Sequence, residues 1–453
     1  MAVIGAQPQS GEQAFNIIEN LSDCGYEGQV YPVNPNYGEV MGKKTYGTIT
    51  DIPGDVDLAV ISTPRHVVPE ILRQCAQKGT RAAIVVVQGF ADATDDDGKR
   101  LQREIVEIAR EGGVRILGPN TLGVANAFVN LSTSFMKLPA MRKLPVAVVS
   151  QSGMFFGKIG GSSMVGKGID LGNACDIDCA EALEYFGQDP DIRVIVLHIE
   201  GVSDGQRFRE AALRVSGKKP VLALKTAWSR QAAGAAQSHT GSLVGKDEVW
   251  GAVFKQAGII RVNDIDEMAD LVRAFCSLPL VGSNRIGVIT VSGGFGIITM
   301  DACARYGLEV AELSPRTIRK LAESAPLWMK VGNPFDIMPT LMISPQSYGE
   351  TFKAMLTEVL SDNNIDSVIL VAGAWLEEAS PTITDVMEEM SQAFPYKAIV
   401  WYPCDGWLYD ISVDCLSQKL EHGGKAAIFP SPDRAVRALA RLARYSRFRN
   451  SPG

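Results

Sequence analysis

The chain has 453 residues, of which 46% are hydrophobic and 21% are charged, and its formal net charge is −7. A chain of this length exceeds what one hydrophobic core organises, so we expect roughly two to four domains and favour three. The acidic balance argues against nucleic acid as a partner, because binding to a phosphate backbone needs a basic excess. No apolar run reaches the roughly 18 to 20 residues of a membrane-spanning helix, so we expect a soluble protein without a membrane partner.

The first residues, 1–5, have neither the basic region nor the cleavage site of a signal peptide. They already predict a strand that runs into a glycine turn. The eight cysteines lie scattered without a CxxC pair, which favours reduced thiols and a cytoplasmic location. Cys175 and Cys179 form the one close pair. Because no histidine or third cysteine stands beside them, ordinary packing is favoured over a metal or redox site, and we expect no bound metal.

Short β-branched runs alternate with glycine turns and helical stretches along the chain. This alternation predicts an α/β protein built from βαβ units, with parallel sheets that are buried on both faces. Three of the runs, at residues 2–6, 146–153 and 286–296, each open a doubly wound unit. The predicted domains span residues 1–122, 144–277 and 284–453, and irregular joints are expected at 122–143 and 277–284.

Further strands are expected within each unit, with room for one helix between neighbours. They fall at residues 29–33, 56–61, 82–87 and 114–117 in the first unit, 194–199 and 220–224 in the second, and 367–372 and 397–401 in the third. Ligands of open parallel sheets bind at the carboxyl ends of the strands. In the first unit the loops at these ends contain Asn34, Pro35, Ser62, Thr63, Pro64, Gln88, Gly89 and Asn120.

The turn between Gly5 and Gly11 is expected to leave backbone N–H groups free at a helix start, which suits a phosphate group. It lacks the GxGxxG spacing, so a purely structural turn is an equally good interpretation. A nicotinamide-dependent dehydrogenase ranks low, because the next strand ends in Val33-Asn34-Pro35 without the acidic residue that would bind the ribose.

In the second unit a strand ends in Ser150-Gln151-Ser152-Gly153. Ser152 and the N–H groups after it fit an oxyanion at a helix start. A plain helix N-cap explains the same residues equally well.

Histidine is scarce, with four in the chain. His239 lies in a loop of small residues, 235–243, where an imidazole has room and backbone donors to carry a phosphoryl group. Glu200, at the end of the strand 194–199, is the natural carboxylate to orient that ring. The alternatives are a structural histidine and a solvated strand end. We interpret the other three histidines as packing or surface residues, with His66 close to the expected ligand edge.

Taken together, motifs from one end of the chain to the other resemble one family. They are Gly5-Ala6 with Gly11, Tyr31–Pro35, Leu117–Asn120, Val149–Gly153, Leu171–Asn173, Ile199–Gly201, Ala223–Lys225, Ser238–Leu243, Gly293-Gly294 and Asn333–Asp336. In this order the chain resembles the ADP-forming acetyl-CoA synthetases, relatives of the succinyl-CoA synthetase α subunit. The resemblance implies an N-terminal Rossmann-like CoA-binding domain followed by two flavodoxin-like domains, and it identifies Ser238–Leu243 as the phosphohistidine segment.

The family implies a phosphoryl relay in which ATP phosphorylates a histidine, a carboxylate takes the phosphoryl group, and CoA displaces phosphate. On this chain the carrier would be His239 and its orienting carboxylate Glu200. The resemblance implies phosphate binding by Ser152, Gly153, Gly172, Asn173 and Gly241, and coenzyme A binding by Gly5, Ala6, Gln7, Ser10, Gly11, Asn34, Pro35, Ser62, Thr63, Pro64, Gln88, Gly89 and Asn120. ATP or ADP and Mg²⁺ would bind only to an ATP-grasp module, which is missing. A β-subunit partner in a hetero-oligomer, or a longer fused enzyme, is therefore implied.

Three departures from the family pattern bear on this expectation. Asn36 stands where the family often has a basic residue, and Met154–Phe156 replace small residues, which is expected to reshape the acyl pocket. Trp228 begins an unusual lead-in to the histidine loop. A non-catalytic CoA-binding or regulatory protein is the alternative, but it would not need both the histidine loop and Glu200.

Overall fold

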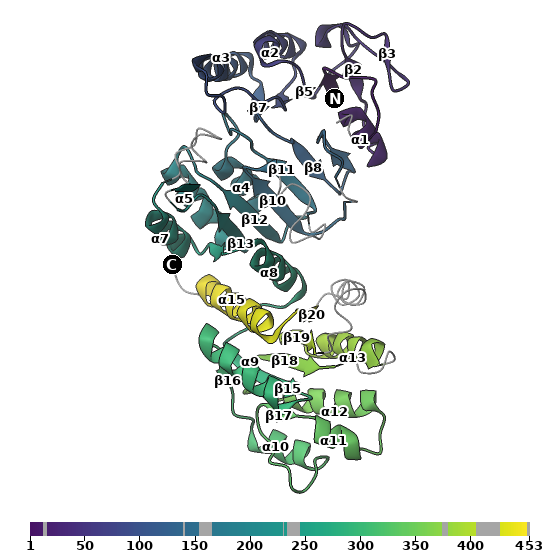
Figure 1. Ribbon diagram of the computed structural model, residues 1–453, viewed down its shortest axis with the longest axis vertical. Coiled ribbons are helices and arrows are strands. Elements are labelled where there is room, and N and C mark those ends of the chain that lie inside the picture. Colours follow the sequence, from purple (N-terminus) through teal and green to yellow (C-terminus); the bar gives the residue numbers. More distant parts are fainter. Residues whose placement is uncertain are drawn as a thin grey trace. The chain divides into compact units, whose positions relative to one another are not determined.

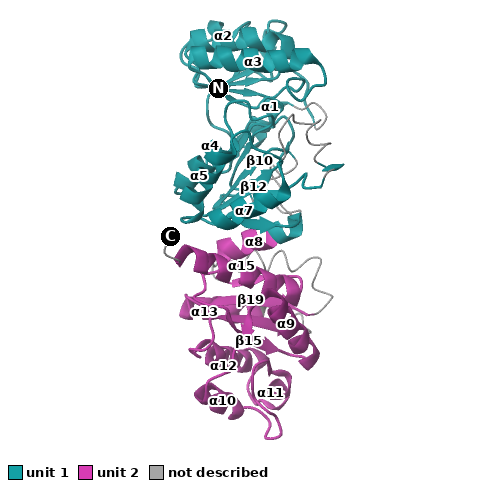
Figure 2. Ribbon diagram, turned by 90° about the vertical axis from the view of Figure 1, so that its left-hand side faces the viewer, with its two compact units in different colours: residues 1–268 teal, residues 269–453 magenta. Residues whose placement is uncertain are grey.

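The computed structural model describes residues 1–11, 16–138, 141–153, 165–229, 231–232, 245–373, 379–404 and 426–450, and the structural statements below concern these residues. The chain divides into two compact units, residues 1–268 and 269–453 (Figure 2). The division lies inside helix α8 (Ile265–Ser277). The three domain spans expected from the sequence remain predictions.

The first sheet has five parallel strands in the order β2-β1-β5-β6-β7 (Figure 1). Val3, Val60 and Ile84 pack on the side of α1, whereas their neighbours along each strand pack on α2 and α3. Burial on both faces is typical of a parallel sheet between helices. The elements are β1 (Ala2–Ile4), α1 (Ile17–Asp23), β2 (Tyr31–Val33), the hairpin β3 (Glu39–Val40) and β4 (Lys43–Lys44), η1 (Ile49–Asp51), β5 (Leu58–Ile61), η2 (Arg65–Val67), α2 (Val68–Lys78), β6 (Ala82–Val85), α3 (Asp96–Gly112) and β7 (Arg115–Leu117).

Helix α3 shows how the sequence sets these elements. Asp95 caps its N-terminus by accepting a hydrogen bond of 2.7 Å from a backbone N–H of the first turn, and Gly113 ends it with φ +68. The buried residues Leu101, Ile105 and Ala109 recur every four positions. They form the apolar stripe that an amphipathic helix places against a sheet.

The second sheet has seven strands in the order β14-β13-β12-β10-β11-β8-β9. β8 and β9 run antiparallel at the β11 edge, whereas the other pairs are parallel. These two strands lie in the stretch 122–143, so the joint that we expected to be irregular is partly the edge of this sheet. The elements are β8 (Val124–Asn126), β9 (Leu131–Ser132), β10 (Val146–Ser150), β11 (Lys167–Asp170), α4 (Cys179–Gln188), β12 (Val194–Ile199), α5 (Gly205–Ser216), β13 (Val221–Lys225), α7 (Asp247–Ala257) and β14 (Ile260–Val262).

The third sheet, in the second unit, has parallel strands in the order β16-β15-β18-β19-β20, with β17 pairing to β15. Within this unit, Arg434 of α15 makes two hydrogen bonds, of 2.6 and 2.8 Å, to the buried carboxylate of Asp270 in α8. The elements are β15 (Arg285–Thr290), α9 (Gly293–Tyr306), β16 (Glu309–Val310), α10 (Pro315–Ala322), β17 (Phe335–Asp336), α11 (Met338–Ile343), α12 (Tyr348–Leu360), β18 (Ser367–Ala372), α13 (Ala379–Ala393), β19 (Ala398–Pro403), β20 (Ala426–Ile428) and α15 (Pro432–Asn450).

The central parallel strands of the three sheets share one order. The first parallel strand (β1, β10 or β15) lies between the next one along the chain (β2, β11 or β16) and a later one (β5, β12 or β18), which is the doubly wound order of the flavodoxin type. The predicted α/β fold is thereby confirmed. Ligands of such sheets bind at the carboxyl ends of the strands at the switch point, where the strand order reverses. The three switch points lie between β1 and β5, between β10 and β12, and between β15 and β18. Within the described ranges, no helix has the length and apolarity that a membrane crossing requires.

Candidate functional site

The ends of β1 and β5 approach each other closely at the first switch point. Gly5 follows β1 with φ +87, and a Cβ on it would lie 2.1 Å from the Ser62 backbone oxygen and 3.0 Å from the Thr63 side chain. Only glycine permits this turn. The Thr63 hydroxyl oxygen is buried and has no hydrogen-bond partner in the described part of the chain. Ala6 and Pro64 continue the two turns, so the predicted residues of both loops lie side by side.

Two side chains at the start of α1 hold the rest of this glycine turn. Asn16 donates to the Gln7 carbonyl at 2.9 Å, and the Glu19 carboxylate accepts a hydrogen bond from the Gly11 backbone at 3.0 Å. The Gly11 N–H is therefore bonded inside the protein and not free as expected. Ser10 lies exposed on the same turn. Our sequence analysis missed Asn16, although an asparagine directly before an apolar helical run is an N-cap signal.

Asn34, at the end of β2, is engaged with the protein backbone. Its side-chain nitrogen donates to the Ala6 carbonyl at 2.8 Å, and its side-chain oxygen accepts from the Asn36 N–H at 3.0 Å. The side chain thus ties the end of β2 to the turn after β1. Pro35 is exposed beside it. A contact of Asn34 or Pro35 with CoA stays a prediction.

The loop after β6, which contains Gln88 and Gly89, is shaped by Arg65 and Asp92. The Arg65 guanidinium donates to the Gly89 carbonyl at 2.6 Å, and the Asp92 carboxylate accepts from the Gly89 N–H at 2.7 Å. Asn120, with φ +61, donates its backbone N–H to a carbonyl of the same loop at 3.0 Å. All the loops predicted to bind CoA therefore meet at one edge of the first sheet.

Gln151 joins the ends of β10 and β12 at the second switch point. Its Oε1 accepts hydrogen bonds from the backbone N–H groups of Glu200, at 2.7 Å, and Gly201, at 3.1 Å. The Ser150 hydroxyl accepts from the Ser152 N–H at 3.0 Å and donates to the Ser152 carbonyl at 2.6 Å. The structure therefore brings Ser152 and Glu200 to neighbouring strand ends.

Lys225, the last residue of β13, holds Glu200 from the other side. Its ammonium nitrogen donates to the Glu200 carbonyl at 2.9 Å and lies 5.4 Å from the centroid of the Trp250 ring. The residue is 3% exposed, and burial lowers the pKa of its ammonium group to about 8. The Glu200 backbone is thus fixed between an amide and a buried cation.

Asp170, at the end of β11, adds a second carboxylate close to Glu200. Burial raises its pKa to about 6, and the charge of Glu200 contributes to the shift. Its side chain accepts a hydrogen bond from the Leu122 N–H at 2.7 Å. A Cβ on Gly153 would lie 2.6 Å from the Leu122 side chain, so glycine allows the turn after β10 to approach this segment.

His198 lies inside the second sheet, in register with Ser150. Its ring nitrogens are 3.2 Å from the Ser150 hydroxyl and 3.1 Å from the Thr226 hydroxyl. Burial, with a contribution from Lys225, lowers its pKa to about 4, so the ring is neutral at pH 7. This buried, hydrogen-bonded ring is a packing residue.

Gly172 and Asn173 hold the loop around Asn120. A Cβ on Gly172 would lie 2.2 Å from a carbonyl oxygen of that loop. The Asn173 side-chain nitrogen donates to Asp92 at 2.7 Å and to Gln102 at 3.0 Å. Both donors of the Asn173 amide are therefore engaged inside the protein, and phosphate binding by these two residues stays a prediction. His239, Gly241 and Met154–Phe156 lie outside the described residues.

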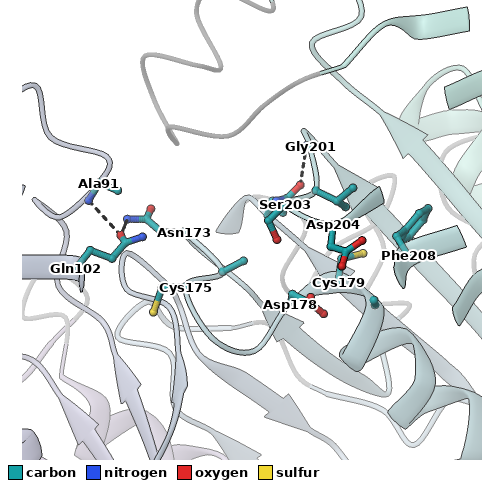
Figure 3. Close-up of a pocket in the computed structure, with 14 residues that line it drawn as sticks. Ala91, Gln102, Asn173, Cys175, Asp178, Cys179, Gly201, Ser203, Asp204 and Phe208 are labelled. Atoms are coloured by element: carbon teal, nitrogen blue, oxygen red, sulfur yellow. Dashed lines mark hydrogen bonds between the residues drawn. The ribbon is translucent and has the colours of Figure 1, made fainter. Parts of the chain in front are cut away.

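A cavity of about 380 Å³ adjoins Gln151 and Gly201 in the first unit. Figure 3 shows Asn173 and Gln102 on one side of it and Ser203, Asp204 and Phe208 on the other. Cys175 and Cys179 also line it. Burial raises the pKa of both thiols, that of Cys175 to about 12, so both are neutral. In the described ranges no group of three or more His, Cys, Asp or Glu side chains is placed to hold a metal ion.

The third switch point repeats the turn geometry of the second. The Thr290 hydroxyl donates to the Ser292 carbonyl at 2.8 Å and accepts from its N–H at 3.1 Å. Gly293 and Gly294 then begin α9. The same hydroxyl-bridged turn therefore follows β10 in the second sheet and β15 in the third.

Comparison with known proteins places these features in one context. Residues 1–127 match the CoA binding domain family, and residues 143–275 match the succinyl-CoA ligase like flavodoxin domain. The α subunit of ADP-forming acetate–CoA ligase I from Pyrococcus furiosus is 34% identical over 99% of this chain and 96% of its own length. An ADP-forming acetate–CoA ligase from Methanocaldococcus jannaschii is 39% identical over 75% of this chain.

Among solved structures, the dinucleotide-forming acetyl-coenzyme A synthetase 1 of Ca. Korarchaeum cryptofilum, in complex with phosphate and ADP, superimposes with a TM-score of 0.85. It is 28% identical, and the match covers 99% of this chain and 96% of that chain. The fold and the matched domains define an α/β protein that joins a CoA binding domain to a succinyl-CoA ligase like domain. The chain belongs to the family of ADP-forming acetate–CoA ligases. The family predicted from the sequence is confirmed, which removes the dehydrogenase alternative. The chain spans about half the length, 48%, of the Methanocaldococcus relative.

Proposed function

We propose that the chain is the CoA-binding, phosphohistidine-bearing component of an NDP-forming acyl-CoA synthetase. The complete enzyme would convert a carboxylic acid, CoA and ATP into acyl-CoA, ADP and phosphate. The observation that carries the proposal is that Gln151 holds Glu200 next to Ser152 at the second switch point, in one compact unit with a domain of the CoA-binding family.

His239 is the proposed phosphoryl carrier. A ring nitrogen attacks the γ-phosphorus of ATP, and an N–P bond forms as the bond to the ADP oxygen breaks. A carboxylate oxygen of the acid then attacks the same phosphorus, which gives an acyl phosphate and restores the imidazole. Finally the CoA sulfur attacks the acyl carbon, phosphate leaves, and the thiol proton passes to solvent.

Glu200 would orient the imidazole during these steps. A carboxylate that accepts a hydrogen bond from one ring nitrogen leaves the other nitrogen unprotonated and nucleophilic. The fixed backbone of Glu200, between Gln151 and Lys225, supports this role. Ser152, Gly153 and Gly241 would contact the phosphoryl group. For Gly172 and Asn173, the contacts with the neighbouring loop favour a supporting role next to this phosphoryl-binding site, called the phosphoryl station below.

CoA would bind along the carboxyl edge of the first sheet. Two features at this switch point support the placement. The buried Thr63 hydroxyl has no hydrogen-bond partner among the described residues, and Gly5 exposes its backbone without a side chain in the way. The predicted contacts are Gly5, Ala6, Gln7, Ser10, Gly11, Asn34, Pro35, Ser62, Thr63, Pro64, Gln88, Gly89 and Asn120.

The ATP-grasp part and its Mg²⁺ would come from a β subunit in a hetero-oligomer or from the rest of a longer chain. The relative from Pyrococcus furiosus is named as an α subunit, whereas this chain spans about half of the Methanocaldococcus relative, 48%. Both facts are compatible with an incomplete enzyme. We place the reaction in the cytoplasm, as the scattered cysteines favour.

The test is to incubate the chain with acetyl-CoA and ³²P-phosphate and to look for an acid-labile phosphate on histidine. His239→Ala should abolish the label, whereas His66→Ala, at an exposed position of η2, should retain it. A label that persists in His239→Ala would remove this histidine from the relay. CoA binding without any label would support the regulatory alternative.

A further inference from the structure

The 380 Å³ cavity beside the second switch point is not used by the relay itself. Gln151 and Gly201 form one of its walls, and the same Gln151 amide holds the Glu200 backbone at 2.7 Å. The residue after Gln151 is Ser152, which is proposed to contact the phosphoryl group. A carboxylic acid whose carboxylate reaches that station could therefore extend its side chain into this cavity.

Three carboxamide side chains line the cavity with fixed orientations. The Asn173 nitrogen is bonded to the Asp92 carboxylate, which can only accept, so the Asn173 oxygen cannot exchange places with it. Gln102 and Gln151 are oriented in the same way, because their oxygens accept backbone N–H groups at 3.1 and 2.7 Å. Within the described residues no hydrogen bond engages their N–H₂ groups, so these can act as donors for the cavity.

The Asn173 oxygen is a buried acceptor, and no hydrogen bond reaches it from the described part of the chain. A buried acceptor without a partner is unfavourable, so a ligand that supplies a donor there gains affinity over one that does not. Phe208, Val202 and Ala180 give the remaining wall an apolar surface. The cavity thus combines room for an alkyl chain with a position for one hydrogen-bond donor.

The charges around the cavity disfavour an anion. Asp178 and Asp204 line it and cap α4 and α5, so that each accepts an N–H of its own helix at 2.9 Å. Arg207 pairs with Asp178 at 2.9 Å, which leaves the Asp204 carboxylate without an ion pair in the described residues. A second carboxylate on the substrate would meet this charge in a partly desolvated place.

We propose that this cavity receives the side chain of the carboxylic acid and selects an uncharged acid whose far end donates a hydrogen bond, a hydroxy acid, over a dicarboxylic acid. This inference rests on the proposed function, because it places the acid at the same phosphoryl station.

The test compares four thioesters in the ³²P-labelling reaction of the full chain: acetyl-CoA, 4-hydroxybutyryl-CoA, its isostere valeryl-CoA and the anionic succinyl-CoA. We expect the single-turnover labelling rate constant at limiting thioester to be about 10-fold higher for 4-hydroxybutyryl-CoA than for valeryl-CoA, and about 100-fold higher than for succinyl-CoA. Val202→Phe, which fills the cavity, should lower the 4-hydroxybutyryl-CoA value by about 10-fold and leave the acetyl-CoA value within about 2-fold. Val249→Phe, exposed on α7, is the matched control.

Two results would overturn the inference alone, while acetyl-CoA still labels the chain. One is equal use of succinyl-CoA and 4-hydroxybutyryl-CoA by the wild type. The other is an equal loss with acetyl-CoA and 4-hydroxybutyryl-CoA in Val202→Phe, which would assign the cavity to the pantetheine arm of CoA. If no thioester labels the chain, the proposed function fails and this inference falls with it.

Discussion

Lys225 is a buried cation that bonds to a backbone carbonyl and not to a carboxylate side chain in the hydrogen bonds described here. Its removal would leave the Glu200 carbonyl without this donor, and Glu200 is the residue proposed to orient the histidine. Lys225→Met is therefore expected to slow phosphohistidine formation by about 10-fold, the effect of losing one charge-assisted hydrogen bond. Single-turnover ³²P labelling measures the rate. Lys218→Met, at an exposed position after α5, should leave it unchanged.

Asp170 makes stability depend on pH in a predictable direction. Its folded-state pKa of about 6 lies above the ordinary value of 3.8, so between these values the folded state binds more protons than the unfolded state. The free energy of unfolding therefore falls as pH rises from about 4 to 6, by at most about 3 kcal/mol. Asp170→Asn cannot ionise and should lack this fall.

Urea unfolding of both proteins at pH 4 and pH 7 measures the effect of Asp170 together with its coupling to Glu200, since titrating groups that do not interact with Asp170 cancel in the comparison. The wild type should be more stable relative to Asp170→Asn at pH 4 than at pH 7. Equal differences at the two pH values would show that the carboxyl group has an ordinary pKa.

At the scale of elements, the approach of β1 to β5 depends on the absence of a side chain at Gly5. Gly5→Ala combines an unfavourable positive φ with a Cβ 2.1 Å from the Ser62 oxygen, whereas Gly54→Ala has a similar φ of +84 and open space around it. We expect a loss of about 1 kcal/mol in unfolding free energy for Gly54→Ala and about 3 kcal/mol for Gly5→Ala. Equal losses of unfolding free energy in the two variants would mean that the ends of β1 and β5 can move apart with little loss of stability.

CoA affinity provides a second measurement on the same pair of variants. Because Gly5 lies at the proposed CoA edge and Gly54 does not, Gly5→Ala should weaken CoA binding at a temperature where both variants are folded. Calorimetric titration with CoA gives the two dissociation constants.

The elements differ in how far the sequence could predict them. The strand Val194–Ile199 was predicted with the bounds that the structure shows, because all six of its positions are buried and five of them are apolar. β8 and β9 were missed, since antiparallel strands of three and two residues carry no periodic signal.

The same contrast holds for the candidate site. Motifs and strand ends pointed to Glu200 and Ser152, but the partners that fix them depend on tertiary pairing. Gln151 bonds across two strands. Lys225 is the last residue of β13 (Val221–Lys225), and only the folded sheet shows which carbonyl its ammonium group reaches.

At the scale of the whole chain, the central parallel strands of all three sheets share one order, and the hydroxyl-bridged turn after the first parallel strand occurs twice. Because each sheet of this order offers a ligand-binding site at its switch point, one chain can hold several ligands of one reaction at separate sites. In the first unit, Asn173, in the loop after β11 of the second sheet, bonds to Asp92, which in turn accepts from Gly89 at the proposed CoA edge of the first sheet.

The nucleotide half-reaction tests whether this chain is one part of a larger enzyme. Its relatives include an α subunit in Pyrococcus furiosus and a longer chain in Methanocaldococcus jannaschii, of which it spans 48%. We therefore expect no ³²P transfer from γ-labelled ATP to the chain alone, although acyl-CoA and phosphate label it. Addition of an ATP-grasp β subunit with Mg²⁺ should restore transfer from ATP, and His239→Ala should block it again. Labelling by ATP without any added subunit would show that the chain contains its own nucleotide site.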